Sequence, residues 1–460
     1  MHLTSTLLRS TASRIAALGA AAVLATSGVA PATAFAADVV PHRIQVHPDR
    51  TLVHKAAAHF GCQDRPIGAG RCYDPGQIQR AYGVDALLAH GITGKKRTIV
   101  IIDAYSNPYV ASDLAIFDAT FGLPDPVLKV IAPQGVPDFD FTNPDHTGWA
   151  GEITLDVQWA HAIAPQAKIV LVEAKSADDA DILAATKYAV DHNLGDVISQ
   201  SFGEGETCVL PDILDAQHRL FKRATDKGIT LIAATGDDGV AQFACDGSDA
   251  VFKDASSPAT DPLVLGVGGT TLDAGAKGRY KGETAWSEAQ DIGIPCLTAD
   301  GDGCSGGGFS DSYRRPSYQA GFGGTRRSAR GIPDVAYSAG VDGGVLLHDG
   351  VFLQVLGLDP LDPTLFFRAG GTSAGTPQWA ALIALADQLA GHRLGLVNDD
   401  LYGFARSSHT YARTFHDIRS GTNDFAGIEG YETSRVWDPV TGLGSPRANV
   451  LVPLLAATGH

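Results

Sequence analysis

The chain has 460 residues, 44% of them hydrophobic, with a formal net charge of −16 and an isoelectric point near 5.3. This length allows a large buried core, and α/β units of this size often form a single domain. The acidic balance argues against nucleic acids and anionic membranes as partners, because phosphate binding needs a basic surface. No apolar run after the N-terminal leader is long enough to span a bilayer, so we expect a soluble globular protein.

The N-terminus has the pattern of a secretory signal peptide over residues 1–36. Arg9 and Arg14 precede an apolar stretch at residues 15–25, and alanines stand at positions 34 and 36. We therefore expect a secreted, extracellular protein.

The next segment, residues 37–71, is short and holds four histidines. Their spacing of five, seven and five residues does not suit a helical metal site, so we interpret them as solvated. A turn and a short helix with Pro75 near its start follow, and we place the main domain at residues 72–460.

Six cysteines in an exported chain indicate disulfides. Their order along the chain favours three local pairs, which are Cys62 with Cys72, Cys208 with Cys245, and Cys296 with Cys304.

Apolar runs rich in β-branched residues have the pattern of strands buried on both faces. They lie at residues 98–103, 167–173, 196–201, 229–234 and 263–267, and helical patterns at residues 178–193 and 210–227 lie between several of them. This alternation predicts an α/β domain whose mostly parallel central sheet is flanked by helices, with ligands at the carboxyl ends of the strands. Residues 275–345 are glycine-rich and less periodic, so we expect loops there.

Residues 149–165 have the pattern of a helix that ends before Pro165. Glu152 and Asp156 are four residues apart and therefore share one face of this helix. Such pairs are usually a solvated acidic face, but the neighbouring side chains here are apolar. We therefore expect a partly buried pair that shares a proton, with one pKa raised.

A second carboxylate motif is Gly236-Asp237-Asp238-Gly239, which follows the predicted strand at residues 229–234. By itself this string is typical of an ordinary turn. Its position beyond the end of a parallel strand is where a site is expected.

The third motif is residues 370–377 (GGTSAGTP), which run into an apolar helical stretch. Ser373 is thereby placed at the start of a helix, near backbone N–H groups that have no partner within the helix. This setting suits a nucleophile. It also suits an N-cap, a position where serine is favoured.

Taken in order, these three motifs resemble those of the sedolisins, the serine-carboxyl peptidases. The resemblance covers roughly residues 73–455 and includes the strings SSPATDPLVLGVGGT, from Ser256, and WDPVTGLGSP near the C-terminus. It implies a subtilisin-like fold and a serine-type endopeptidase acting in acid, with tripeptidyl-peptidase activity as a further option. Its partners would be peptide or protein substrates, and we expect a monomer.

The resemblance also implies a role for each residue of the three motifs. Ser373 is the nucleophile, Glu152 is the general base and later acid, Asp156 orients and tunes Glu152, and Asp237 donates a hydrogen bond in the oxyanion hole. A protonated Asp237 can donate to a developing oxyanion, whereas an ionised one cannot.

One structural calcium ion near the C-terminus is a further implication of the resemblance, held by two carboxylates and backbone carbonyls. The matching positions are Asp417, Ile418, Ser434, Val436 and Asp438. Ser434 and Val436 stand where the family usually has glycines, although only their carbonyls are required. The alternative is that the two aspartates simply cap turns.

Two other hypotheses remain open at this point. A subtilisin-type Ser-His-Asp site would use Asp103 with His90 or His146, but it would leave Glu152 and Asp156 unexplained. A non-catalytic peptide-binding protein on the same fold is disfavoured by the presence of all four catalytic side chains.

Two features depart from the family pattern. Sedolisins usually carry a long prosegment, whereas about 35 residues separate the predicted signal peptide from the predicted peptidase domain. They also commonly have tryptophan in a Ser-x-Ser-Trp-Gly string, where this chain has Phe202. Phenylalanine keeps an aromatic wall but lacks the N–H donor, so substrate preference is expected to differ.

A first test concerns Ser373. Because Ser373→Ala removes a single oxygen, the variant should fold normally yet lose peptide-bond hydrolysis by at least about a thousandfold. The measurement is the rate on a denatured protein substrate, with matched circular dichroism spectra of parent and variant. Cleavage at a rate comparable to that of the parent would mean that Ser373 has only a structural role.

Overall fold

The predicted strands form the centre of one sheet with the order β14-β13-β9-β7-β4-β6-β5, in which β17 also pairs with β13. All pairs from β13 to β5 are parallel, and β14 is antiparallel at one edge. The strand bounds are β4 Thr98–Ala104, β5 Val127–Ile131, β6 Lys168–Ala174, β7 Val197–Gln200, β9 Thr230–Ala234, β13 Val264–Ala274, β14 Tyr280–Ala285 and β17 Val335–Ser338. The prediction of a mostly parallel α/β sheet is confirmed.

This computed structural model describes Ile44, Val46 and residues 50–56, 59–248, 250–288, 303–322 and 328–458. The chain divides into two units, Met1–Val40 and Pro41–His460. The predicted signal peptide lies outside the described residues. Within them, no helix combines the length and the hydrophobicity that a membrane crossing needs.

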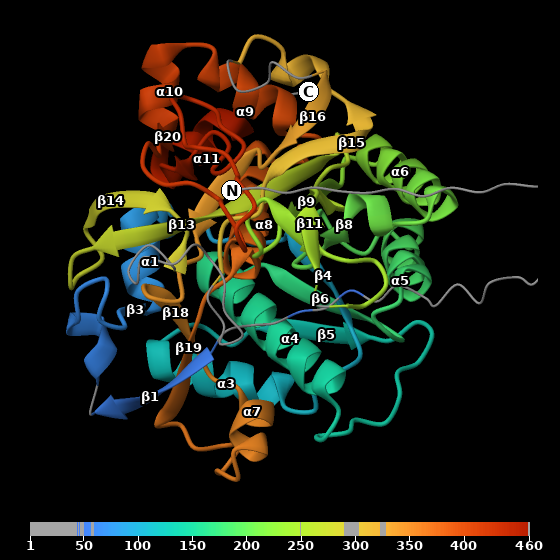
Figure 1. Cartoon of the computed structure of the whole chain (residues 1–460). Helices are drawn as coiled ribbons and strands as arrows, with labels where there is room; N and C mark the ends of the chain where they lie inside the picture. The colour runs from blue at the N-terminus through green and yellow to red at the C-terminus, as the bar shows by residue number, and fades with distance from the viewer. Residues whose placement is uncertain are drawn as a thin grey trace, which may run out of the picture. The chain divides into compact units, whose positions relative to one another are not determined.

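Helices cover both faces of the sheet (Figure 1). Helices α4 (Pro144–Ile163) and α8 (Thr372–Ala390) pack on one face, and α5 (Asp179–Asp191) and α6 (Pro211–Asp226) pack on the other. Strand β4 shows why: Ile99 and Ile101 join the core on the α4 side, whereas Val100 and Ile102 join the core on the α5 side. Successive side chains of a strand point to opposite faces, so an unbroken apolar run needs cover on both.

Helix α4 begins five residues earlier than the pattern at residues 149–165 suggested. The Asn143 side chain accepts a hydrogen bond from the Asp145 N–H, and Pro144 stands at the first helical position, where its missing N–H costs nothing. The helix ends at Ile163, before Pro165, as predicted.

A second sheet has the order β2-β1-β19-β18-β3. Its strands are β1 Arg50–Ala56, β2 His59–Phe60, β3 Cys72–Tyr73, β18 Gly344–Leu347 and β19 Leu365–Ala369. Strand β1 is antiparallel to β19, with Arg50 opposite Ala369. The packed structure therefore extends upstream of the boundary predicted at residue 72, while His54 and His59 are exposed as expected.

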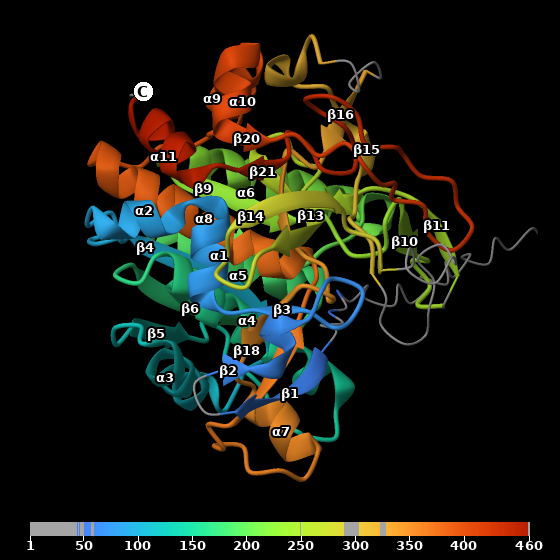
Figure 2. The same ribbon diagram turned by 90° about the vertical axis from the view of Figure 1, so that its left-hand side faces the viewer.

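The remaining helices surround these sheets. Helices α9 and α10 lie at one end of the unit and α7 at the opposite end, in both views (Figures 1 and 2). Their bounds are α1 Pro75–Tyr82, α2 Val84–Ala89, α3 Val110–Phe121, α7 Gly350–Val355, α9 Asn398–Ala405, α10 Ser408–Thr414 and α11 Ala448–Ala456.

The prediction of loops over residues 275–345 was partly wrong, because short strands form there, including β15 (Gly308–Arg314) and β16 (Ala329–Ile332). Glycine-rich strands lack the apolar periodicity that a sequence pattern needs. The other short strands are β8 Glu204–Gly205, β10 Ala241–Phe243, β11 Val251–Lys253, β12 Ser256–Ser257, β20 Phe415–His416 and β21 Ser445–Pro446.

Two predicted disulfides are confirmed, Cys62–Cys72 and Cys208–Cys245. Cys304 is also disulfide-bonded, and its predicted partner Cys296 lies outside the described residues.

Candidate active site

Glu152 and Asp156 lie on the buried face of α4, with 1% and 0% of their surface exposed. Burial raises the pKa of both carboxyls well above the usual range. The negative charge of Asp156 raises the pKa of Glu152 further, while interaction with the Ser373 hydroxyl lowers it. The predicted dyad is therefore buried rather than a solvated acidic face, so the pair holds a proton to a higher pH than free carboxyls do.

Ser373 is the second residue of α8, and it is not the N-cap. That position belongs to Gly371, and no side chain caps the helix. The Ser373 Oγ donates a hydrogen bond to the carbonyl of Ser201, at 3.1 Å, and interacts with the Glu152 carboxyl. The capping role that the sequence left open is thus excluded, and the hydroxyl instead faces the dyad.

Asp237 lies three residues beyond β9 and contacts the start of α8. Its Oδ1 accepts hydrogen bonds from the Thr372 N–H, at 2.8 Å, and from the Thr372 hydroxyl, at 2.7 Å. Gly371 has a φ of 99°, and a Cβ at this position would stand 2.7 Å from Oδ2 of Asp237. Only glycine suits both the backbone conformation and the close approach. Asp237 therefore touches the residue next to Ser373.

Glu152, Asp237 and Ser373 line one pocket. Its lining residues are Val46, Glu152, Ser201, Phe202, Gly203, Ala234, Gly236, Asp237, Asp238, Gln242, Gly370, Thr372 and Ser373. Phe202 thus lines the cleft, where the family resemblance implied an aromatic wall.

No histidine is among the described residues that line this pocket. His90 is exposed at the end of α2, where its Nδ1 lies 2.7 Å from the Ala86 carbonyl. His146, on α4, accepts a hydrogen bond from the Asp140 N–H and packs 4.7 Å from the Tyr105 ring. The geometry therefore does not assemble the Ser-His-Asp alternative.

Asp103 joins the dyad as a further buried carboxyl. It lies near the end of β4, opposite Glu173 of β6 in the sheet register, and its surface is fully buried. Its negative charge raises the pKa of Asp156, and the pKa of Asp103 is itself raised by burial, by Glu152 and by Glu173. Burial raises the pKa of Glu173 to about 7. The sequence shows Asp103 at the end of a strand, but its pattern suggests this residue only as the aspartate of a Ser-His-Asp site.

Arg50 of β1 supplies a positive charge near this acidic group. Its guanidinium forms a buried ion pair with Asp349 and fills the space above Gly151 of α4. The charge of Arg50 lowers the pKa of Glu152, against the larger effects that raise it. Nothing in the sequence pattern connects Arg50 to the dyad. The pairing of β1 with β19 brings Arg50 to α4.

The C-terminal positions expected to hold calcium lie in one loop region. Hydrogen-bond donors of the protein contact the oxygen atoms that were expected to bind the ion. Asp417 Oδ1 accepts from the Tyr411 hydroxyl, at 2.9 Å, and from the Val436 N–H, at 3.0 Å. The Tyr411 hydroxyl also lies 3.1 Å from the Val436 carbonyl, another expected ligand. Oδ2 of Asp417 pairs with the Arg419 guanidinium, at 2.6 Å. The Tyr411 hydroxyl and the Arg419 guanidinium therefore bind the oxygen atoms of Asp417 and Val436 that were expected to bind calcium.

The second expected carboxylate is similarly engaged. Asp438 accepts hydrogen bonds from the backbone N–H groups of Ser434, Val440 and Thr441, and Ile418 is buried. Both expected carboxylates and the Val436 carbonyl therefore accept hydrogen bonds from groups of the protein itself.

Comparison with known proteins identifies the class. Residues 143–401 match the family model described as the subtilase family, so the chain belongs to that family. The match spans α4, with Glu152, and the start of α8, with Ser373.

Among its relatives, the chain is 32% identical to kumamolisin of Bacillus sp. (strain MN-32) over 415 residues, which is 87% of this chain and 66% of that protein. It is 29% identical to sedolisin of Pseudomonas sp. (strain 101), covering 87% of this chain and 63% of that protein. A solved structure of Pseudomonas sedolisin, complexed with pseudo-iodotyrostatin, aligns with a TM-score of 0.71 and 26% identity over 85% of this chain and 100% of that chain. Within the subtilases, this protein is a sedolisin-type serine-carboxyl peptidase relative.

The chain spans 66% and 63% of the length of these two relatives.

Removing the negative charge of Asp103 tests its place in the site. Asp103→Asn should lower the pKa of Asp156, because the repulsion that raises it is lost, and the high-pH limb of the activity profile should move down by roughly one pH unit. The measurement is kcat/KM against pH, with Asp273→Asn on the exposed part of β13 as a control. Superimposable profiles of Asp103→Asn and the parent would remove Asp103 from the titrating group.

Proposed function

We propose that this protein is a secreted serine-carboxyl peptidase that hydrolyses peptide bonds in acid. The single observation that supports it most is that Ser373 and the buried Glu152 line one pocket and interact, with Asp156 buried one helical turn from Glu152, while no histidine is among the described residues that line this pocket. A serine needs a base within reach before it can attack, and Glu152 is that base here.

The reaction follows from this arrangement. As the Ser373 Oγ attacks the carbonyl carbon of the peptide, its proton passes to Glu152, and the carbonyl oxygen gains negative charge. Glu152 then returns the proton to the leaving amine, which leaves an acyl-enzyme on Ser373. Water, deprotonated by Glu152 in turn, hydrolyses the ester and restores the serine.

The two aspartates support the charges that this sequence creates. Asp156 lies one helical turn from Glu152 and is buried with it, so it can share the proton that Glu152 receives. Protonated Asp237 donates to the developing oxyanion, and its hydrogen bonds from Thr372 hold it next to the nucleophile.

Secretion is supported by the predicted signal peptide and by the disulfides, which are typical of oxidising compartments. We propose that the enzyme cleaves peptides and unfolded proteins at internal bonds, and that it is a monomer.

The pH dependence of hydrolysis tests this mechanism. Carboxyl pKa values are ordinarily roughly 4, and burial raises those of Glu152 and Asp156, so activity should be greatest in acid and should fall as rising pH removes the shared proton. A histidine base behaves oppositely, since it works only above about pH 6. Hydrolysis of a denatured protein from pH 3 to 8 separates the two, and a neutral or alkaline maximum contradicts the proposal.

Asp237→Asn sharpens the test. An amide donates at every pH, so this variant should lose roughly ten- to hundredfold in kcat at acid pH through altered geometry, yet decline less steeply toward neutrality. The matched control is Asp273→Asn, the same change at an exposed position of β13. If Asp237→Asn kept both the rate and the pH profile of the parent, another oxyanion donor would be needed.

For the C-terminal loop, we propose that Tyr411 and Arg419 take the place of the calcium ion that the family resemblance implies. The hydroxyl joins Asp417 to the Val436 carbonyl, and the guanidinium neutralises Asp417. A proton donor and a fixed cation thereby stabilise the loop without an ion.

Thermal unfolding tests this substitution. Tyr411→Phe should lower the free energy of unfolding by about 1–2 kcal/mol, because Asp417 Oδ1 and the Val436 carbonyl both lose the Tyr411 hydroxyl as a donor. Tyr188→Phe on α5 serves as the control. Chelation should leave the melting temperature of the parent unchanged. A rise of several degrees with excess calcium, reversed by chelator, would restore the calcium site.

A further inference from the structure

A cavity of about 250 Å³ lies beside the C-terminal end of β1. Its wall comes from β1, β2, the turn after β2, the start of α1 and the end of α3. The lining residues are Lys55, Phe60, Gln63, Asp74, Gly76, Thr120 and Phe121. One water molecule needs only roughly 10–15 Å³ of such space, so the cavity has room for a small organic molecule.

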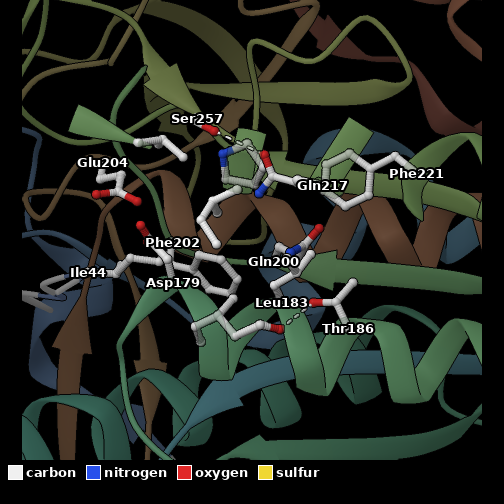
Figure 3. Close-up of a pocket in the computed structure, with 14 residues that line it drawn as sticks. Ile44, Asp179, Leu183, Thr186, Gln200, Phe202, Glu204, Gln217, Phe221 and Ser257 are labelled. Carbon is white, nitrogen blue, oxygen red and sulfur yellow. Dashed lines mark hydrogen bonds between the residues drawn. The ribbon is translucent and has the colours of Figure 1, made fainter. Parts of the chain in front are cut away.

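This cavity is separate from the proposed catalytic site. Arg50, whose charge acts on Glu152, and Lys55 are five residues apart on β1, which is roughly 16 Å at about 3.3 Å per residue. The pocket that contains Ser373 and the neighbouring pocket shown in Figure 3 both include Phe202, but neither shares a described residue with the cavity. A ligand in the cavity would therefore not occupy the place of a peptide substrate.

Two phenylalanine rings form the apolar part of the wall. Phe60 stands opposite Lys55 in the β1–β2 ladder, so both side chains lie on the same face of the hairpin. The Phe121 ring, from the last residue of α3, lies 6.2 Å from the Phe60 ring between centroids. The pair presents aromatic surface to the cavity, and a further ring packs favourably against such surface.

Two opposite charges line the same cavity without neutralising each other. The Lys55 amine forms no ion pair or hydrogen bond with any residue that the structure describes, although the Lys55 backbone N–H is held by the Thr364 carbonyl at 2.8 Å. Asp74 accepts only from neutral donors, the Gln77 N–H at 2.8 Å and the Gln63 side-chain amide at 2.6 Å. A carboxylate has about four acceptor positions, so Asp74 can still accept from an ammonium group.

The position of Asp74 is fixed before any ligand arrives. Gln63 is only 4% exposed, and its side-chain oxygen accepts from the Phe60 N–H at 2.9 Å while its nitrogen donates to Asp74. The same nitrogen donates to the Gln77 side chain at 2.9 Å, and that side chain accepts from the Asp74 N–H at 3.0 Å. A wall that is already ordered lowers the entropic cost of binding.

We propose that this cavity binds a free aromatic α-amino acid, a function distinct from peptide hydrolysis. The ligand ammonium would donate to Asp74, its carboxylate would accept from Lys55, and its ring would pack on Phe60 and Phe121. Hydrogen bonds between charged groups are the strong ones, and a zwitterion supplies both of the charges that the cavity leaves unpaired. The flexible four-carbon stem of Lys55 lets its amine approach a carboxylate held beside Asp74.

Isothermal titration calorimetry of L-phenylalanine into the full chain tests the proposal. At about pH 6 the carboxylates of ligand and protein are ionised and their amines are protonated, and one molecule should bind per chain. The compound 3-phenylpropanoate lacks the ammonium and 2-phenylethylamine lacks the carboxylate, so each should bind at least about tenfold more weakly. No saturable binding of L-phenylalanine up to about 10 mM, or equal binding of the three compounds, overturns the proposal.

Two variants locate the ligand. Lys55→Gln and Asp74→Asn each remove one charge and should each weaken binding of L-phenylalanine at least about tenfold. Asparagine caps a helix as well as aspartate does, so Asp74→Asn should keep α1 and the melting temperature of the parent. The matched control is Lys168→Gln, the same change at the exposed first residue of β6, which should bind like the parent. Unchanged binding in either Lys55→Gln or Asp74→Asn would place the ligand elsewhere, the catalytic cleft included, and contradict the proposal.

Discussion

Two carboxyl groups share one buried face of α4, and the cost of burying them shapes the site around it. A buried charge is costly unless it is paired or neutralised by a proton. Glu152 and Asp156 are almost fully buried, and the pKa of each is raised, so the proton is the means by which the helix tolerates them. In the mechanism we propose, Ser373 exchanges its proton with this pair, so the constraint on stability and the proposed catalysis have one physical origin.

The sheet places the other groups around this pair. In a parallel sheet the carboxyl ends of the strands meet at one edge, which brings Asp103, Ser201 and Asp237 from separate strands to the same place. Helix α8 then presents Ser373 from the far end of the sequence, and the positive φ of Gly371 makes its close approach to Asp237 possible. Around the dyad, Asp103 raises the pKa of Asp156, and Arg50 lowers that of Glu152.

Interactions between residues that are distant in sequence stabilise both ends of the domain. Strand β1 pairs with β19, which leads into the turn before Ser373. In the C-terminal loop, hydrogen bonds and an ion pair connect Tyr411, Arg419, Val436 and Asp417. In each case polar groups of the chain satisfy one another within a packed region, where leaving them unpaired would be costly.

Much of the fold and the core of the site follow from the sequence alone. The β-branched runs predict the parallel strands, and the i, i+4 spacing of Glu152 and Asp156 on an apolar helix predicts a buried pair, because periodicity and burial are local properties. The order of the three motifs also indicates the family. Local pattern could not show that Ser373 faces Glu152 rather than capping its helix, or that Asp103 and Arg50 act on the dyad. Those contacts join residues up to hundreds of positions apart, and they exist only because strand pairing and helix packing close the chain on itself. The same reason explains the C-terminal loop, where the sequence offers plausible calcium ligands and the tertiary contacts of Tyr411 and Arg419 decide how those ligands are used.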